Sequence, residues 1–307
     1  MHDLVIIGSG PAGMTAGIYS AIYKLDTLVI GEKPGGYASD AYKILNYPGL
    51  PDIGGTDLMQ KFRAHLDNFK IKQINDLVTS ILLKNNDFEI TTKKNKYFSK
   101  TIILASGSER KKLHIPGEIE FTGKGVAYCA TCDAFFFKDK ITAVIGGSDT
   151  AITSALQLTD YAKKVYIIFR KDKLSAMPEW IEKASNNKKI TFISNTNVKS
   201  INGGNSVESI ELDKEYDSSK TLKIDGVFIE IGSAPLVTLV KNIGIKVNDK
   251  GFVIVEKNQG TNIKGFFAAG DVTTGSNGFE QIITASAEGA IAANSAFKYI
   301  QSIKNLG

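Results

Sequence analysis

The fold is decided by one stretch, Leu4-Val5-Ile6-Ile7-Gly8-Ser9-Gly10-Pro11-Ala12-Gly13, in which a short apolar strand enters a glycine-rich turn. The residues that follow predict a helix and then a second strand over 27–30. Gly8 permits the tight turn, Gly10 lets the backbone approach a pyrophosphate, and Gly13 lets helix and strand pack closely. The N–H groups and the dipole at the helix start favour a phosphate there. The stretch therefore predicts a dinucleotide-binding fold.

An acidic residue after the second strand extends this pattern. The helix is expected to run from Pro11 to about Tyr23, and Glu32 lies nineteen residues past Gly13. At this distance an acid meets a ribose hydroxyl in such folds. The alternative is a tight turn without a ligand, but the full strand–turn–helix–strand order favours a dinucleotide site.

A second turn of the same kind follows an expected strand over 141–145. It reads Gly146-Gly147-Ser148-Asp149-Thr150-Ala151 and precedes an expected helix to about Tyr161 and a strand over 165–169. Ser148 replaces the second glycine, so a pyrophosphate would be held less closely. The chain is therefore expected to carry two dinucleotide folds.

Basic residues follow the strand of the second unit. Arg170, Lys171 and Lys173 stand where the 2′-phosphate of NADPH would lie. The alternative is a solvated strand end.

The rest of the chain predicts that one fold is inserted into the other. An apolar strand over 101–107 precedes Pro116-Gly117, where the chain is expected to cross into the second domain. A similar segment with Gly and Pro near 232–241 is expected to lead the chain back to the first domain. A later strand then delivers Asp271 to a strand end, and a small-residue helix is expected over 281–290. The expected class is α/β, with two nested Rossmann-like dinucleotide-binding domains.

The chain contains just two cysteines, Cys129 and Cys132, spaced as Cys-x-x-Cys and followed by Asp133. Such a pair near a βαβ pattern predicts a redox motif in which one thiol pKa is lowered. The alternative, half of a zinc site, lacks further ligands at suitable spacing, so no metal is expected. Asp133 is a candidate acid/base and, alternatively, a helix N-cap.

The composition indicates which class of protein, which partners and which compartment to expect. The 307 residues are 43% hydrophobic and 22% charged, with a formal net charge of +5, as in a globular protein without a strong preference for nucleic acid. No apolar run is long enough for a membrane span, and the start of the sequence lacks a signal-peptide pattern. We therefore expect a cytoplasmic protein with no membrane or nucleic-acid partner.

These motifs, in this order and spacing, resemble those of the low-molecular-weight thioredoxin reductases, which are two-dinucleotide-fold flavoproteins. The similarity spans nearly the whole chain. It rests on GSGPAG at 8–13, PGG at 34–36, NYPG at 46–49, ASG at 105–107, IPGE at 115–118, YCATCD at 128–133, the turn at 146–151 and AAGDV at 268–272.

The resemblance implies that residues 1–112 and 242–307 bind FAD and that the inserted residues 113–241 bind a nicotinamide dinucleotide. It also implies a homodimer that passes electrons from NADPH through FAD and the cysteine disulfide to thioredoxin or a thioredoxin-like protein. Cys132 would face the flavin, Cys129 would attack the partner's disulfide and Asp133 would protonate a leaving thiolate. The expected cofactor-binding residues are Gly8, Gly10, Pro11, Ala12, Gly13, Glu32, Gly36, Asn46, Ala105, Gly107, Gly270, Asp271, Gln281 and Ile282 for FAD, and Gly146, Gly147, Ser148, Asp149, Thr150, Arg170 and Lys171 for NADPH.

Departures from the family pattern lie mainly on the nicotinamide side. Besides Ser148, the usual His-Arg-Arg with a later Arg is here Phe169-Arg170-Lys171 and then Ser175. Because Lys lacks the two-pronged phosphate contact of Arg, NADH competes with NADPH as the expected donor. The same motifs also fit an enzyme reduced by ferredoxin, a flavin dithiol oxidase and a flavin-bound redox sensor.

Overall fold

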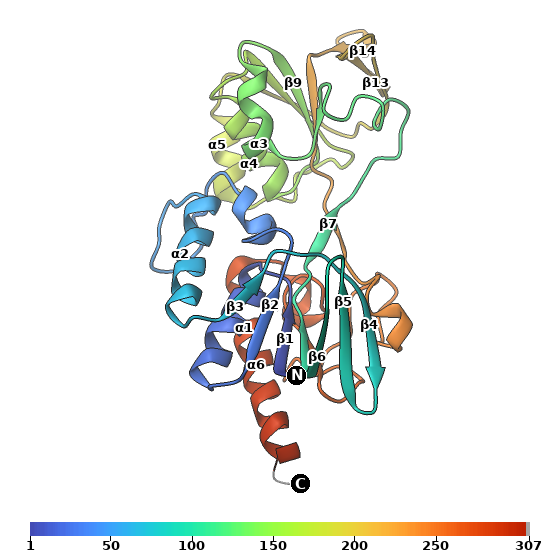
Figure 1. Cartoon of the computed structure of the whole chain (residues 1–307). Coiled ribbons are helices and arrows are strands. Elements are labelled where there is room, and N and C mark those ends of the chain that lie inside the picture. Colours follow the sequence, from blue (N-terminus) through green and yellow to red (C-terminus); the bar gives the residue numbers. More distant parts are fainter. Residues whose placement is uncertain (305–307) are drawn as a thin grey trace. The chain divides into compact units, whose positions relative to one another are not determined.

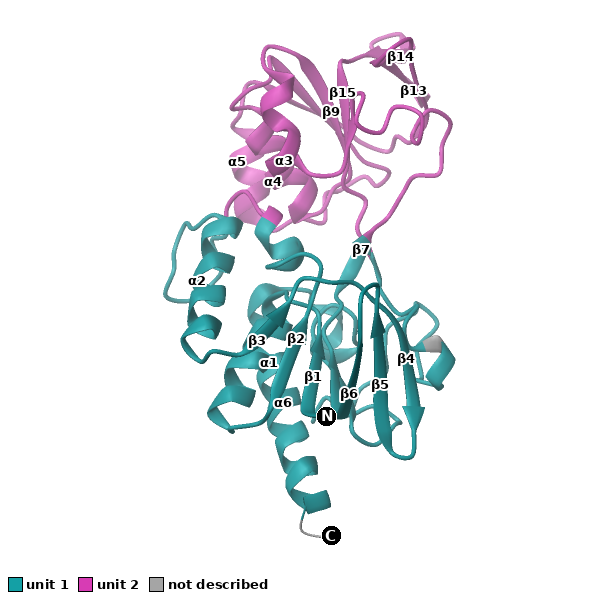
Figure 2. Cartoon of the chain, viewed as in Figure 1, with its two compact units in different colours: residues 1–39, 44–109, 234–307 teal, residues 40–43, 110–233 magenta. Residues whose placement is uncertain are grey.

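The computed structural model describes residues 1–304, and Figure 1 shows the arrangement of its helices and strands. The chain divides into two compact units (Figure 2). Unit 1 comprises Met1–Ser39, Ile44–Glu109 and Ala234–Gly307, and unit 2 comprises Asp40–Lys43 and Arg110–Ser233. Residues Arg110–Ser233 are thus inserted between two parts of unit 1, and Asp40–Lys43, which lies within the expected 1–112 segment, groups with unit 2. Which nucleotide each expected domain binds, 1–112 with 242–307 or 113–241, stays a prediction.

Unit 1 is built on a sheet in the order β3-β2-β1-β6-β5-β4, with β17 also pairing to β6. Strands β3, β2, β1, β6 and β17 are parallel, and β4, β5 and β6 form an antiparallel meander. The bounds are β1 His2–Ile7, α1 Pro11–Ile22, β2 Thr27–Ile30, η1 Gly36–Asp40, α2 Gly55–Asn68, β3 Lys72–Ile74, β4 Val78–Lys84, β5 Asp87–Thr92, β6 Lys96–Leu104, η3 Lys241–Ile243, β17 Phe266–Ala268, η4 Gly275–Gly278 and α6 Ile282–Lys304.

The central strands are apolar where both faces of this sheet are covered, over residues 4–7 of β1, 28–30 of β2 and 102–104 of β6. Leu4 and Ile6 of β1 point to one face, where α1 and α6 join the same core cluster. Val5 and Ile7 point to the other face and pack with Val240 and other residues that follow the return of the chain. Small residues let α1 and α6 approach closely: a Cβ added at Gly289 would lie 2.2 Å from the Ala12 carbonyl oxygen.

Unit 2 repeats the β3-β2-β1 part of the unit 1 sheet as β11-β10-β9. Its parallel sheet runs β11-β10-β9-β15-β8, and a separate antiparallel sheet runs β12-β13-β14. The bounds are β8 Val126–Ala127, α3 Ala130–Asp133, η2 Ala134–Phe137, β9 Ile141–Ile145, α4 Asp149–Leu158, β10 Lys164–Ile168, α5 Pro178–Ser185, β11 Ile190–Ile193, β12 Val198–Gly203, β13 Val207–Tyr216, β14 Ser219–Lys223 and β15 Gly226–Ile229. Two nested Rossmann-like units of α/β class are therefore confirmed.

The two chain crossings between the units pair with each other. β7 Ser108–Arg110 and β16 Ser233–Pro235 form a two-stranded sheet. On the unit 1 side the Leu236 N–H donates to the Gly107 carbonyl at 3.1 Å, and on the unit 2 side the Lys111 N–H donates to the Gly232 carbonyl at 3.0 Å.

Several element ends differ from the sequence-based expectation. The strand expected over 101–107 is β6, which starts at Lys96 and stops at Leu104. The helix expected to end near Tyr161 stops at Leu158, and the helix expected over 281–290 continues to Lys304. This last helix is longer because its small residues, which include Ala292, Ala293 and Ala296, stay buried in the core shared with α1.

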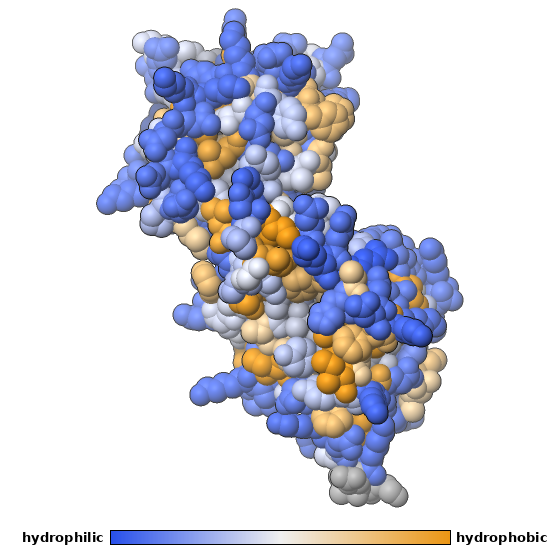
Figure 3. Space-filling view, turned by 90° about the vertical axis from the view of Figure 1, so that its left-hand side faces the viewer, coloured by the Kyte–Doolittle hydropathy of each residue, from blue (hydrophilic) through white to orange (hydrophobic). Residues whose placement is uncertain are grey.

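The surface drawn in Figure 3 is mostly hydrophilic, with hydrophobic groups lying among charged residues. Among residues 1–304, no helix combines the length and the apolar character needed to cross a bilayer.

Candidate functional site

The first glycine turn is shaped by close backbone packing. A Cβ at Gly8 would lie 2.0 Å from the Ala105 carbonyl oxygen, and a Cβ at Gly13 would lie 1.9 Å from the Gly8 carbonyl oxygen. A Cβ at Gly10 would meet nothing closer than 3.9 Å. Gly8 and Gly13 are therefore required by the fold itself, while the space at Gly10 suits a group from outside the chain, such as a pyrophosphate.

Two other segments of unit 1 border this turn. The Gly35 N–H donates to the Ser9 carbonyl at 2.8 Å, and a Cβ at Gly36 would lie 3.3 Å from the Gly10 Cα. On another side, a Cβ at Gly270 would lie 3.0 Å from the Ala12 Cβ. The fold thus gathers segments that the sequence separates by more than two hundred residues, and these segments carry most of the residues expected at FAD.

The loop after β17 is held by a buried carboxylate that the sequence analysis did not single out. Glu288 of α6 accepts hydrogen bonds from the Gly270 N–H at 2.8 Å, the Thr273 hydroxyl at 3.0 Å and the Ser276 hydroxyl at 2.6 Å. Asp271 lies in the same loop. Burial raises the pKa of Asp271 to about 6, and the Glu280 and Glu288 carboxylates push this pKa in the same direction.

The remaining expected FAD residues lie at the edges of this region. Asn46 bonds Gln281, and Ile282 begins α6. Glu32 follows β2 as expected, and its carboxylate is paired with Lys93 at 3.1 Å, both side chains being more than half exposed. A ribose hydroxyl at Glu32 would therefore share this carboxylate with the Lys93 ammonium group.

The second turn opens in the same way as the first. The Gly146 N–H donates to the Ile168 carbonyl at 2.9 Å, as the Gly8 N–H does to the Ile30 carbonyl at 2.7 Å. A Cβ at Gly146 would lie 2.1 Å from the Glu230 carbonyl oxygen.

The rest of the second turn carries side chains that the first turn lacks. Ser148 is the N-cap residue of α4, and Thr150 lies in the first turn of that helix. Asp149 accepts from the Met177 N–H at 2.6 Å, and the Ser175 N–H donates to the Gly147 carbonyl at 2.8 Å. The loop after β10 is thereby fastened to the turn. Arg170 and Lys171 of this loop are exposed, which is compatible both with a phosphate contact and with a solvated strand end.

The two cysteines form a disulfide at the start of α3. Their Cα atoms are 5.3 Å apart, within the usual range for such a bond. Cys129 is the N-cap residue, and its sulfur accepts a hydrogen bond from the Cys132 N–H at 3.1 Å. Cys129 is half-buried and Cys132 is exposed. A hydrogen bond of this kind stabilises a thiolate on Cys129 once the disulfide is reduced.

Asp133 is the last residue of α3 and stands at the N-cap position of the following helix η2, not at the N-cap position of α3. Cys129 takes that position, and within the described residues Asp133 makes no side-chain capping bond to the 3₁₀ helix η2 that follows. Burial raises the pKa of the Asp133 carboxyl above its usual value. This shift is in the direction that suits a proton donor to a thiolate.

Sequence reasoning missed an aromatic pair beside the disulfide. Phe135 and Phe136 of η2 are 55% and 62% exposed, and their ring centroids are 3.9 Å apart. Exposed aromatic pairs of this kind are enriched at protein interfaces. The consecutive phenylalanines after Cys-Asp-Ala were a readable signal in the sequence.

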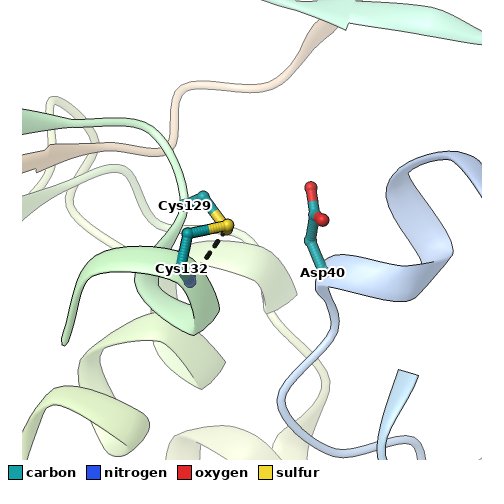
Figure 4. A group of neighbouring side chains, drawn as sticks. All are labelled: Asp40, Cys129 and Cys132. Carbon is teal, nitrogen blue, oxygen red and sulfur yellow. Dashed lines mark hydrogen bonds between the residues drawn. A yellow bond between two sulfur atoms is a disulfide. The ribbon is translucent and has the colours of Figure 1, made fainter. Parts of the chain in front are cut away.

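It also missed Asp40, because nothing in the sequence links this residue to the cysteines. Segment 40–43 belongs to unit 2, where the Thr131 hydroxyl donates to the Asp40 carbonyl and the Tyr42 hydroxyl donates to Asp160 at 2.7 Å. Figure 4 shows the Asp40 side chain close to the Cys129–Cys132 disulfide.

Two nested dinucleotide folds, one of them carrying a disulfide between closely spaced cysteines, define a pyridine-nucleotide-type disulfide oxidoreductase. The chain belongs to the pyridine nucleotide-disulphide oxidoreductase family, whose model matches residues 2–289, and within it to the thioredoxin reductases. This family implies the use of a flavin and a nicotinamide cofactor.

Three relatives illustrate the match. The thioredoxin reductase of Listeria monocytogenes is 38% identical over 99% of this chain and 95% of its own length. The crystal structure of the Lactococcus lactis thioredoxin reductase is 36% identical, with a TM-score of 0.94, covering 98% of this chain and 100% of that one. A ferredoxin-flavin thioredoxin reductase from Clostridium acetobutylicum is 34% identical, with a TM-score of 0.54, over 98% of both chains.

Proposed function

We propose that this thioredoxin reductase uses NADPH and FAD to reduce its Cys129–Cys132 disulfide and then the disulfide of thioredoxin or a thioredoxin-like protein. The observation that carries the proposal is the Cys129–Cys132 disulfide, with one exposed cysteine, next to the exposed Phe135–Phe136 pair. Because aromatic residues are enriched at protein–protein interfaces, the exposed phenylalanines that follow the disulfide favour a protein substrate.

FAD is the flavin that unit 1 suits. The space at Gly10, the neighbouring Gly36 and the helix start at Pro11 would hold its pyrophosphate, and Asp271, Asn46 and Gln281 would contact other parts of it. When bound, FAD supplies the two-electron exchange between a nicotinamide and a disulfide. The protein's part is to bind and orient it.

The cysteines and Asp133 then act on the partner protein. The Cys129 thiolate attacks one sulfur of the partner's disulfide, forming a mixed disulfide and releasing a partner thiolate, which takes the proton of Asp133. Cys132 gives its proton to the Asp133 carboxylate and attacks the Cys129 sulfur, which restores the internal disulfide and releases the second partner thiolate, and this thiolate takes the proton from Asp133. Two electrons and two protons have then moved to the partner.

NADPH is the proposed donor because Arg170 and Lys171 stand at the end of β10, where a 2′-phosphate would lie. NADH is the competing donor, since Ser148 and the missing later Arg weaken the expected grip on NADPH. The Clostridium relative makes reduced ferredoxin a third arm of the test. Assembly as a homodimer and a cytoplasmic location are further expectations from the resemblance.

Anaerobic titration of the purified yellow protein with NADPH, with NADH and with reduced ferredoxin, followed at the flavin absorption band, tests the proposal. We expect NADPH to bleach the band within minutes, and bleaching by ferredoxin alone would overturn the proposed donor. In an insulin-coupled assay, Cys129→Ser should still permit bleaching by NADPH but lose turnover of thioredoxin. Full turnover by this variant would overturn the role of Cys129.

A further inference from the structure

Three potential ligand groups come together in unit 2. One carboxylate oxygen of Asp40 and the sulfur atoms of Cys129 and Cys132 all lie within 4.8 Å of one another (Figure 4). Asp133, although next to Cys132 in sequence, is not a member of this group. In the oxidised chain the two sulfurs are bonded to each other. They become strong metal ligands only after reduction, when they can form thiolates.

The Asp40 carboxylate is held in place by its surroundings. Its side chain is 11% exposed, and its Oδ2 lies 3.4 Å from Nη2 of Arg110. Arg110 is fixed in turn by a 2.7 Å contact from Nη1 to the buried Glu230 carboxylate. The Thr131 hydroxyl, from the residue between the two cysteines, holds the Asp40 carbonyl. The carboxylate is therefore tied to the same segment that carries the sulfurs.

We propose that the reduced chain binds one divalent cation of the zinc type through Cys129, Cys132 and Asp40. Two thiolates and one carboxylate are ligands that zinc prefers, and a water would complete the tetrahedron. Zinc bonds of about 2.0–2.3 Å place the ligand atoms of a tetrahedral site about 3.5 Å apart. To reach this geometry the two sulfurs move apart after reduction, and the Asp40 carboxylate closes in from a separation of at most 4.8 Å.

The binding step balances without any further redox partner. Reduction adds two electrons and two protons to the disulfide, giving two thiols, and the cation then displaces both protons to solvent. A phosphine reductant with one water supplies those electrons and protons and becomes the phosphine oxide. Because both sulfurs would be metal ligands, neither could attack a partner disulfide. The site would act as a reversible brake on the reduced form alone.

The test uses the full-length flavin-containing protein, kept anaerobic and either oxidised or reduced by the phosphine. Each form is dialysed against micromolar Zn²⁺, and bound zinc is measured by atomic absorption. We expect one zinc per reduced chain, none per oxidised chain, and protection of both cysteines from alkylation by mass spectrometry. No zinc on the reduced chain, or equal zinc on both forms, would overturn the site.

Matched variants test whether zinc binding depends on Asp40 and not on Asp133, the carboxylate next to Cys132 in sequence. Asp40→Asn should weaken zinc binding by about tenfold or more, while Asp133→Asn should leave it unchanged. Equal affinities for wild type and Asp40→Asn would remove Asp40 from the site. Should Asp40→Asn fail to fold, zinc-edge X-ray absorption on the reduced wild type decides: two sulfur and two lighter ligands support the site, and two sulfurs with two further sulfurs from a second chain contradict it. The test does not depend on NADPH or thioredoxin, so it is independent of the proposed function.

Discussion

The side-chain amide of Asn46 donates a 2.8 Å hydrogen bond to Oε1 of Gln281, although 235 residues separate the two. The bond joins the segment ahead of α2 to the residue just before α6. Both residues are expected at the flavin, so this bond links two separate pieces of the expected FAD site.

Loss of this bond should affect flavin retention more than folding. Gln281→Ala removes the acceptor, and because the bond is exposed we expect a loss of less than about 1 kcal/mol in the free energy of unfolding. Flavin bound after dialysis should fall several-fold. Asn294→Ala, which breaks a 2.8 Å bond to Tyr23 elsewhere in unit 1, is the control. Equal flavin retention by both variants would count against a role for Gln281 at the flavin.

Two glycines of the first turn should respond differently to the same substitution. Gly13→Ala forces a Cβ to 1.9 Å from the Gly8 carbonyl, so we expect loss of the folded state or a sharply lower melting temperature. Gly10→Ala has room within the chain, and its φ of −81° suits alanine. It should keep the melting temperature of the flavin-free protein but bind FAD poorly. Normal FAD binding by Gly10→Ala would argue against a pyrophosphate at Gly10.

Glu288 should matter for stability because its carboxylate is buried and accepts three hydrogen bonds. Glu288→Ala leaves the Gly270 N–H and two hydroxyls without this acceptor, at an expected cost of about 2–4 kcal/mol in urea unfolding. Glu288→Gln should cost less, since one carbonyl oxygen remains. Ser302→Ala, which removes a hydroxyl bonded to the Tyr299 carbonyl on the same helix, should be nearly neutral. If Glu288→Ala were equally neutral, the loop would not depend on this carboxylate.

The raised pKa of Asp271 gives a pH dependence with a defined sign. The folded pKa is about 6 and the ordinary value about 3.9, so the folded chain holds a proton there that the unfolded chain releases. This carboxyl therefore contributes up to about 3 kcal/mol of stability at low pH, which is lost as pH rises from about 4 through 6. In the flavin-free protein, the difference in unfolding free energy between Asp271→Asn and wild type should grow over this range. Parallel pH curves would refute the assignment.

Asp133 should act in the thiol steps rather than in flavin reduction. Asp133→Asn removes the proton donor, so we expect stopped-flow reduction of the partner disulfide to slow on the order of tenfold or more. Flavin reduction by NADPH should stay near the wild-type rate. Asp139→Asn, an exposed change in the same segment, is the control. An unchanged dithiol step in Asp133→Asn would argue against an acid role.

The sequence predicted best those structural features whose residues lie close together along the chain. Both glycine turns, the strands β2 and β9 and the Cys129–Cys132 pair follow from local spacing, since each feature is completed within a few residues. The fold class followed from the repeat of the strand–turn–helix order. The N-cap alternative for Asp133 corresponds to the start of η2, where its side chain makes no capping bond, whereas the N-cap of α3 at Cys129 was not predicted because cysteine is not a favoured residue there.

The remaining features depend on contacts between distant segments. Thr131 and Asp40 are 91 residues apart, so no pattern in the sequence indicates that Asp40 lies beside the disulfide. The bonds of Glu288 to the loop after β17, and the extension of α6 beyond Ala290, arise from packing against α1 and that loop. Local propensity carries no information about such packing.

The pairing of β7 with β16 has a topological consequence. The outer unit leaves off at Glu109 and resumes at Ala234, and the cross-strand bonds hold these two points side by side. The inner unit thus occupies the position of a hairpin loop. A shortened gene joining the two flanks through a tight turn would encode the outer unit together with Asp40–Lys43, and circular dichroism would show whether it folds.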